Sequence, residues 1–209
     1  MEFKNKILTL KEDSDSNSYT HIDIGFLTAF LSKDKDFTTD ENVVTLYVPE
    51  NTKFQNATLN SALGNILLNH VCFESGTVSS GDGDIFIKNS TLKEVAVSAS
   101  LGDVKTYDSK IKTCNFVLSD GDFTAKNNEF TGETLINDDL GNIEVQGSKK
   151  QWSSLGVDAS TDLGDIEVSE TLEGTLKEND SDESEYQRSG KNGKVKLHAE
   201  DGDITMKCN

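Results

Sequence analysis

Aspartates that stand beside glycines are the residues of this sequence best placed to do chemistry. After five glycines the next residue is Asp84, Asp103, Asp122, Asp165 or Asp203, and Asn65 and Asn142 follow two further glycines. Three units carry a second carboxylate before the glycine, which gives the pairs Asp82/Asp84, Asp120/Asp122 and Asp201/Asp203. Hard cations such as Ca²⁺ bind about six to eight oxygen ligands of this kind. The candidate calcium ligands are therefore Asp82, Asp84, Asp103, Asp120, Asp122, Asp201 and Asp203.

A structural interpretation of the same aspartates competes with the metal site, and we favour it. Short carboxylates and amides bond nearby backbone N–H groups in turns. Carboxylates stacked about 4.8 Å apart would repel each other unless hydrogen bonds or a cation compensated them. We therefore expect no cofactor, with Ca²⁺ as the alternative.

The glycines beside these residues recur at a nearly constant spacing. They are Gly64, Gly83, Gly102, Gly121, Gly141, Gly164 and Gly202, separated by 19, 19, 19, 20, 23 and 38 residues. Large apolar residues keep the same period, as in the column Phe54, Phe73, Leu92, Ile111 and Phe130. Self-similarity at a fixed period indicates a repeat architecture. We expect the seven glycines to be structural turns, because glycine tolerates the positive φ that tight turns require.

Within each repeat, apolar and polar residues alternate, as in Val95-Ala96-Val97 and Ile143-Glu144-Val145. This period of two predicts short, half-buried β-strands. A unit of 19 residues is too small to bury its own apolar side, so neighbouring units must stack. The sequence therefore predicts an all-β, single-domain β-solenoid that is β-helix-like and right-handed, with about nine coils of about 19 residues each.

The departures from the period predict the organisation of the rest of the chain. Residues 1–19 are expected to be an N-terminal tail or cap, and residues 20–209 the solenoid domain. A side loop is expected near residues 147–155, which hold Trp152, and an acidic loop near residues 178–192. Because 38 is twice 19, one more coil is expected inside the last step, with its turn near Glu183.

Composition excludes several classes of function. The 209 residues include 20 Lys and Arg against 37 Asp and Glu, a net charge of −17 that argues against nucleic-acid binding. The sequence contains no run of about 20 apolar residues, so we expect no direct insertion into a membrane. Cys72, Cys114 and Cys208 are widely spaced and predict no disulfide framework, and Cys114 is expected in the core.

Catalysis has little support in the sequence. A polysaccharide hydrolase needs two carboxylates about 5–10 Å apart in a cleft, which the paired aspartates could supply. A lyase would need a cationic group, yet Arg188 is the only arginine. Phe86, Tyr107, Trp152 and Tyr186 are expected to face solvent without forming a stripe for sugars. We expect no enzymatic activity, with a carbohydrate-active β-helix hydrolase or lyase using paired aspartates as the alternative.

Residues 43–54, followed by Leu59 and Gly64-Asn65-Ile66, resemble the entry segment of a bacterial adhesin-like family of β-strand repeat domains. Strands in that family end in Gly-Asp-Ile, and the matches here are Gly83-Asp84-Ile85, Gly102-Asp103-Val104, Gly164-Asp165-Ile166 and Gly202-Asp203-Ile204. The resemblance covers residues 20–209. It implies a β-helix-like solenoid and a setting at the cell surface or outside the cell, and it brings no catalytic residues.

We therefore expect a non-enzymatic, cell-envelope-associated binding or scaffolding domain with a repetitive acidic surface. Its partner would be a protein or a glycan, bound through many weak contacts. Unpaired strand edges at the ends of the solenoid could also support end-to-end self-association. A cytoplasmic location fits as well, because the sequence carries no leader or anchor.

Overall fold

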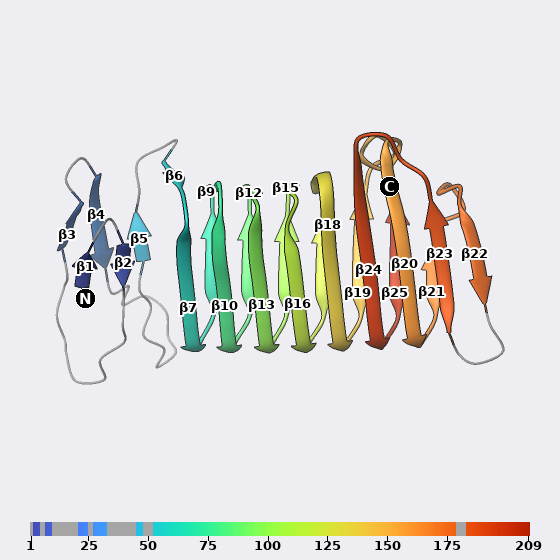
Figure 1. Ribbon diagram of the computed structural model, residues 1–209, viewed down its shortest axis with the longest axis horizontal. Coiled ribbons are helices and arrows are strands. Elements are labelled where there is room, and N and C mark those ends of the chain that lie inside the picture. Colours follow the sequence, from blue (N-terminus) through green and yellow to red (C-terminus); the bar gives the residue numbers. More distant parts are fainter. Residues whose placement is uncertain are drawn as a thin grey trace. The chain divides into compact units, whose positions relative to one another are not determined.

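The computed structural model describes residues 2–4, 7–9, 21–24, 27–32, 45–47, 52–178 and 183–209 (Figure 1). The chain divides into two compact units, Met1–Thr52 and Lys53–Asn209. Among the described residues, no helix has both the length and the apolar character needed to cross a bilayer.

The strands of the first unit pair antiparallel. β1 (Glu2–Lys4) pairs with β2 (Ile7–Thr9), and β3 (His21–Ile24), β4 (Leu27–Ser32) and β5 (Thr45–Tyr47) form a separate sheet in that order. Solenoid coils stack through parallel pairs, so the assignment of the strands between residues 20 and 48 to the solenoid is wrong. The solenoid unit begins at Lys53. The other residues of the expected tail at 1–19 lie outside the described residues.

The second unit confirms the predicted all-β solenoid. Its first five coils are β6 (Lys53–Phe54), β7 (Ala57–Leu63) and β8 (Ile66–Asn69); β9 (Cys72–Phe73), β10 (Gly76–Asp82) and β11 (Ile85–Lys88); β12 (Thr91–Lys93), β13 (Val95–Leu101) and β14 (Val104–Tyr107); β15 (Lys110–Lys112), β16 (Asn115–Asp120) and β17 (Phe123–Lys126); and β18 (Glu129–Leu140) with β19 (Ile143–Gly147). Gly76 of β10 pairs with Ala57 on one side and Val95 on the other, an offset of one repeat.

The last coil of the sequence inserts between two earlier ones. β20 (Leu155–Leu163) and β21 (Ile166–Val168) form the coil at the end of the stack. β24 (Gly193–Asp201) pairs parallel with both β18 and β20, and β25 (Ile204–Cys208) with both β19 and β21. The sheet that contains one strand of every coil has seven strands in the described residues, not the nine expected. Figure 1 shows β24 and β25 seated between these neighbours.

The coil expected near Glu183 is absent from the described residues around that position. Instead, β22 (Thr175–Glu178) and β23 (Ser184–Arg188) form an antiparallel hairpin, and β23 pairs antiparallel with β20 at the end of the solenoid. The hairpin occupies part of the predicted acidic loop, and residues 179–182 lie outside the described residues.

The predicted side loop near residues 147–155 contains a helical turn, α1 (Lys149–Trp152). The Ser148 side chain accepts a hydrogen bond from the Gln151 N–H, while the Gln151 side chain accepts from the Ser148 N–H, which forms a capping box. Trp152 is only 3% exposed, and its Nε1 donates to the Lys207 carbonyl at 2.9 Å. The expectation that Trp152 faces solvent is wrong, because the turn folds back over the coil.

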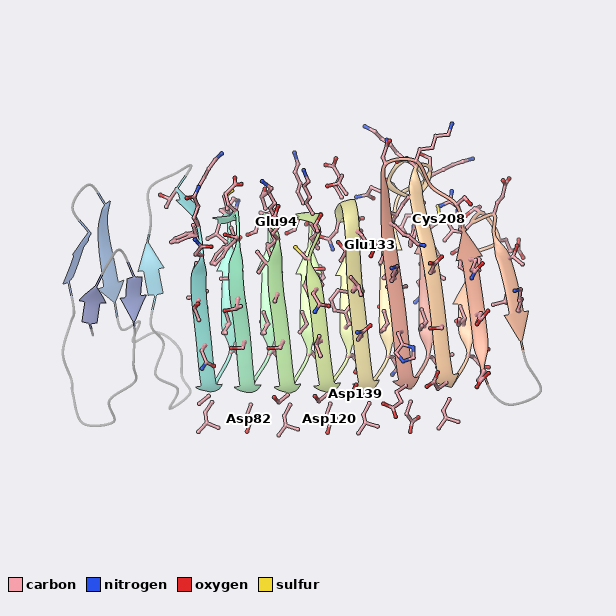
Figure 2. The ribbon with its side chains drawn as sticks, viewed as in Figure 1. Asp82, Glu94, Asp120, Glu133, Asp139 and Cys208 are labelled. Atoms are coloured by element: carbon pink, nitrogen blue, oxygen red, sulfur yellow. The ribbon has the colours of Figure 1, made fainter. Side chains whose placement is uncertain are left out.

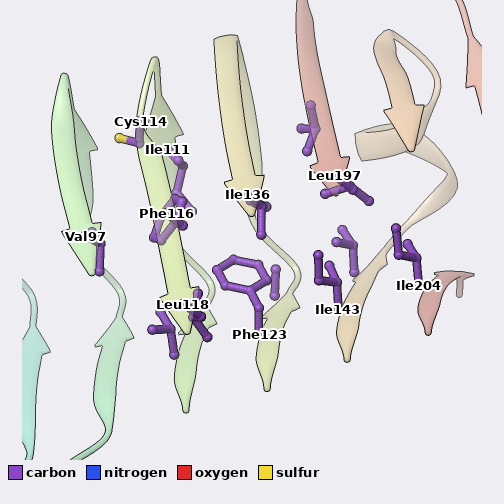
Figure 3. Close-up of a cluster of buried hydrophobic side chains, with 14 of the residues drawn as sticks. Val97, Ile111, Cys114, Phe116, Leu118, Phe123, Ile136, Ile143, Leu197 and Ile204 are labelled. Atoms are coloured by element: carbon purple, nitrogen blue, oxygen red, sulfur yellow. The ribbon is translucent and has the colours of Figure 1, made fainter. Parts of the chain in front are cut away.

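The core is a narrow stack of inward-facing columns (Figure 3). Val97, Phe116, Ile136 and Leu197 occupy one column in register, and each is at most 2% exposed. Cys114 is 2% exposed, which confirms its prediction as a core residue. This thin core explains how a chain with only 34% hydrophobic residues can fold as a solenoid.

Candidate functional site

The glycines of the Gly-Asx turns stack on one another where the backbone turns between two sheets. Gly102 has φ +133°, and a Cβ at this position would lie 2.7 Å from the Gly83 carbonyl oxygen. A Cβ on Gly121 would overlap the Gly102 carbonyl oxygen in the same way. The turns therefore need glycine for conformation and for the close approach of successive coils.

The residues after these glycines form a hydrogen-bonded column. Each side-chain Oδ1 accepts from the backbone N–H of the equivalent residue in the next coil: Asn65 from Asp84 (2.8 Å), Asp84 from Asp103 (2.9 Å), Asp103 from Asp122 (2.9 Å), Asp122 from Asn142 (2.8 Å), Asn142 from Asp203 (2.9 Å) and Asp203 from Asp165 (2.9 Å). We call these seven residues the Asx column. The backbone N–H groups explain how stacked carboxylates are tolerated, because each bond supplies the hydrogen-bond compensation that the stacking requires.

Asp103 shows how local contacts hold one member of the Asx column ionised. Burial acts to raise the pKa of Asp103, but hydrogen bonds from Lys105 and from the Asp122 N–H outweigh it and lower the pKa. Lys105 Nζ lies 2.6 Å from Asp103 Oδ2.

The residues just before the glycines alternate in type along the solenoid. In spatial order, by strand register, they are Leu63, Asp82, Leu101, Asp120, Leu140, Asp201 and Leu163. We call this row the leucine–aspartate ladder. Its leucines are 72%, 52%, 54% and 53% exposed in the same order, and its aspartates are also exposed. Figure 2 shows Asp82 and Asp120 at the lower ends of β10 and β16, directed away from the ribbon.

This alternation determines where the predicted calcium candidates lie. Asp82/Asp84 and Asp120/Asp122 each flank one glycine, but the coil between them contributes Leu101 instead of a carboxylate. Paired carboxylates therefore recur at every second coil, about 9.6 Å apart along the stack. Among the side chains described, no three His, Cys, Asp or Glu residues gather closely enough to hold a metal ion.

A buried carboxyl that the sequence interpretation missed lies beside this edge. Asp138 is 1% exposed, and neither of its carboxylate oxygens has a hydrogen-bond partner. Burial raises the pKa of Asp138 to about 7, and the negative charges of Asp122 and Asp139 add to the effect. Ala199 holds the same column on the next coil, so the repeat phase could have marked Asp138 as inward-facing.

A shallow groove of about 320 Å³ lies on the outer face near the C-terminal coil. Its lining includes Ser160 and His198, and Ser160 Oγ lies 3.1 Å from His198 Nδ1. The two residues are 38 positions apart, or two repeats, so the sequence could have revealed the pair. The N–H groups of these strands are committed to the sheet, and the pair has no paired donors for an oxyanion.

The remaining candidates for sugar chemistry serve structural roles. Tyr186 is 2% exposed, so its predicted exposure is wrong, and its hydroxyl donates to the Leu172 carbonyl at 3.3 Å. Arg188 Nη1 donates to the carbonyls of Trp152 (2.6 Å) and Leu155 (3.3 Å), which ties the hairpin to the last coil of the stack. Phe86 and Tyr107 are half-buried.

Comparison with known proteins identifies a family for the chain. The model of the family described as Toastrack DUF4097 matches residues 12–207. No curated protein and no solved structure matches the chain.

Proposed function

This chain belongs to the Toastrack DUF4097 family, whose members are β-repeat domains of unknown function, and we propose that it is a non-enzymatic binding or scaffolding domain. We propose that it acts at the cell envelope, at the surface or outside the cell, as an adhesin-like domain. Its partner would be a protein or a glycan that contacts the repetitive acidic surface at several coils at once.

The leucine–aspartate ladder is the observation that carries this proposal. Exposed leucine and aspartate side chains alternate in it along the solenoid. The side chains of Leu63, Leu101, Leu140 and Leu163 are each more than half exposed. A row of exposed apolar residues bordered by polar ones is typical of an interaction surface. Multivalency along such a row would supply affinity without a deep pocket.

The alternative, a carbohydrate-active enzyme that uses paired aspartates, receives less support. The paired aspartates lie on an exposed edge, and the Oδ1 atoms of Asp84, Asp122 and Asp203 accept backbone hydrogen bonds. Arg188, the cation that a lyase would need, donates to two backbone carbonyls.

A glycan array combined with a reducing-sugar assay tests the proposal. We expect binding without turnover for any glycan ligand, and a protein partner if no glycan binds. Turnover of any polysaccharide by the purified chain, lost on substitution Asp122→Asn, would overturn the non-enzymatic function. Protease shaving of intact cells would test location, because an envelope-exposed domain is cleaved while a cytoplasmic marker survives.

Two further proposals concern cofactors and assembly. We propose that the domain needs no resident cofactor; a calcium titration should leave its melting temperature unchanged, and a rise would favour a metal role for the Asx column. The second proposal is end-to-end self-association through an edge strand such as β22. Because this strand has only four residues, it is a poor template for pairing, and any such association would be weak. Light scattering over a concentration series separates a monomer from end-to-end chains.

A further inference from the structure

The order of the leucine–aspartate ladder depends on the insertion of the C-terminal coil. In chain order, Leu140 and Leu163 are consecutive members of the ladder. The inserted coil places Asp201 between them, in register with both leucines. Strict alternation is thus a property of the folded edge, and it extends over all seven coils.

The spacing of the ladder restricts the shape of a partner. Successive leucines are two strand spacings apart, about 9.4–9.8 Å, so four leucines span about 28–29 Å. A polyproline II helix presents every third side chain on one face, at about 9.3 Å per turn, or about 28 Å over three turns. Seven residues of an α-helix rise about 10.5 Å, which accumulates to about 31–32 Å over three heptads. In a β-strand, residues three apart face opposite sides.

The charge of the edge restricts the chemistry of a partner. The ladder runs beside the aspartates of the Asx column, and a second flank carries Asp139, Glu200 and Asp162 on the last three coils. Lys105 is the one cation that pairs with the Asx column among the described side chains. A second copy of this acidic edge would be repelled, whereas a cationic segment would be attracted.

We propose that the leucine–aspartate ladder binds a polyproline II segment of a partner protein that carries an apolar side chain at every third position and Lys or Arg between them. The apolar side chains pack on the exposed leucines, and the cations reach the aspartates of the intervening coils. This inference rests on the proposed binding function and names the surface and the class of partner.

The test measures binding of a labelled peptide, (Pro-Leu-Lys)4, to the whole chain by fluorescence anisotropy. Twelve residues in polyproline II conformation span about 37 Å, enough to cover the four leucines. We expect saturable binding that weakens as salt rises from about 0.05 to 0.5 M, because screening shortens the reach of exposed charges. Comparison peptides are (Pro-Ser-Lys)4, which lacks the apolar residues, and an amphipathic α-helical peptide with the same numbers of Leu and Lys.

Variants of the ladder separate its two contributions. The double variant Leu101→Ser/Leu140→Ser should weaken binding about tenfold or more, because it removes half of the apolar contacts. The double variant Asp82→Asn/Asp120→Asn should weaken binding about five- to tenfold and flatten the salt dependence. Matched controls are Leu67→Ser, 68% exposed in β8, and Glu129→Gln, exposed in β18. Both lie on other sheets or strand segments and should bind as the wild type does.

The proposal is overturned if (Pro-Leu-Lys)4 does not bind at millimolar concentration, or if (Pro-Ser-Lys)4 or the α-helical peptide binds as tightly. It is also overturned if the leucine variant binds like the wild type while circular dichroism shows both folded. If one of these results is obtained but the chain binds a glycan or another peptide, the polyproline II proposal fails and the proposed binding function remains. Polysaccharide turnover would instead remove the proposed function, whatever the peptide does.

Discussion

The substitution Asp138→Thr should stabilise the protein, and more so at high pH. Asp138 is 1% exposed with no hydrogen-bond partner for its carboxylate. Thr161 occupies the same column two coils along, and its Oγ1 donates to the Gly202 carbonyl at 2.9 Å. Ser80 makes the equivalent contact with Gly64 at 3.5 Å. Threonine at position 138 has nearly the volume of aspartate and can donate to the glycine carbonyl of the preceding coil.

The magnitude follows from the raised pKa of Asp138. Burial, with smaller contributions from Asp122 and Asp139, raises this pKa from 3.8 to about 7. The folded chain therefore holds a proton that the unfolded chain releases, so stability falls as pH rises from about 4 to about 7. At 1.36 kcal/mol per pKa unit, the cost is about 2 kcal/mol at pH 5 and about 4 kcal/mol at pH 9. The substitution should remove this cost, so its benefit grows by about 2 to 3 kcal/mol between these pH values.

Urea unfolding at pH 5, 7 and 9 measures the effect, with reversibility checked at each pH. The difference between variant and wild type isolates Asp138, because the repulsion from the rest of the −17 charge is nearly common to both. Asp162→Thr is the matched control, since it removes an exposed aspartate of another coil and leaves Asp138 and the charges that act on it in place. Equal pH dependence in the wild type and the Asp138 variant would refute the reasoning, as would a variant less stable than the wild type at pH 9.

Three further substitutions probe the turns and the hairpin. Gly102→Ala places a Cβ 2.7 Å from the Gly83 carbonyl oxygen at φ +133° and should destabilise the chain by about 2 kcal/mol or more, read from the urea midpoint. Asp103→Ala removes the acceptor for the Asp122 N–H and should cost about 1–3 kcal/mol, whereas Asp103→Asn keeps that acceptor and should cost less; equal losses would contradict the role of Oδ1. Arg188→Gln removes two hydrogen bonds to backbone carbonyls and should speed hydrogen exchange in β22 and β23 while leaving β10 unchanged. Equal exchange rates of β22 and β23 in the Arg188 variant and the wild type would argue against Arg188 as the anchor of the hairpin.

The repeat was predictable because equivalent positions of successive coils stack on one another. Successive coils from Lys53 onward pair at a fixed register, so the period, the inward columns and the glycine turns can be predicted from the sequence. The order of the last coils was not, because the turn at Gly202 is chemically equivalent to any other turn. The distance of 38 residues fits two repeats as well as it fits an excursion through a hairpin and back.

The candidate edge was only partly predictable for a related reason. The sequence shows the aspartates on both sides of the glycines, because they are neighbours along the chain. The sequence does not show the alternation with leucines, because Leu140 and Leu163 are successive along the chain and only the inserted Asp201 separates them in the fold. Trp152 and Tyr186 lie in segments between coils, so the period predicts no inward position for them, yet both segments fold back over the solenoid and bury these rings.

The insertion of the C-terminal coil has a consequence for folding on the ribosome. The first five coils can stack as they emerge, each on the one before, but β20 and β21 have no parallel neighbour until residues 193–208 are synthesised. Until then, the edge of β20 that later pairs with β24 has no partner strand. A nascent chain that stalls before residue 193 would thus expose unpaired strands, a state that chaperones and proteases can recognise. Residues 193–208 thus close the solenoid from within, after the coils on both sides of them have been made.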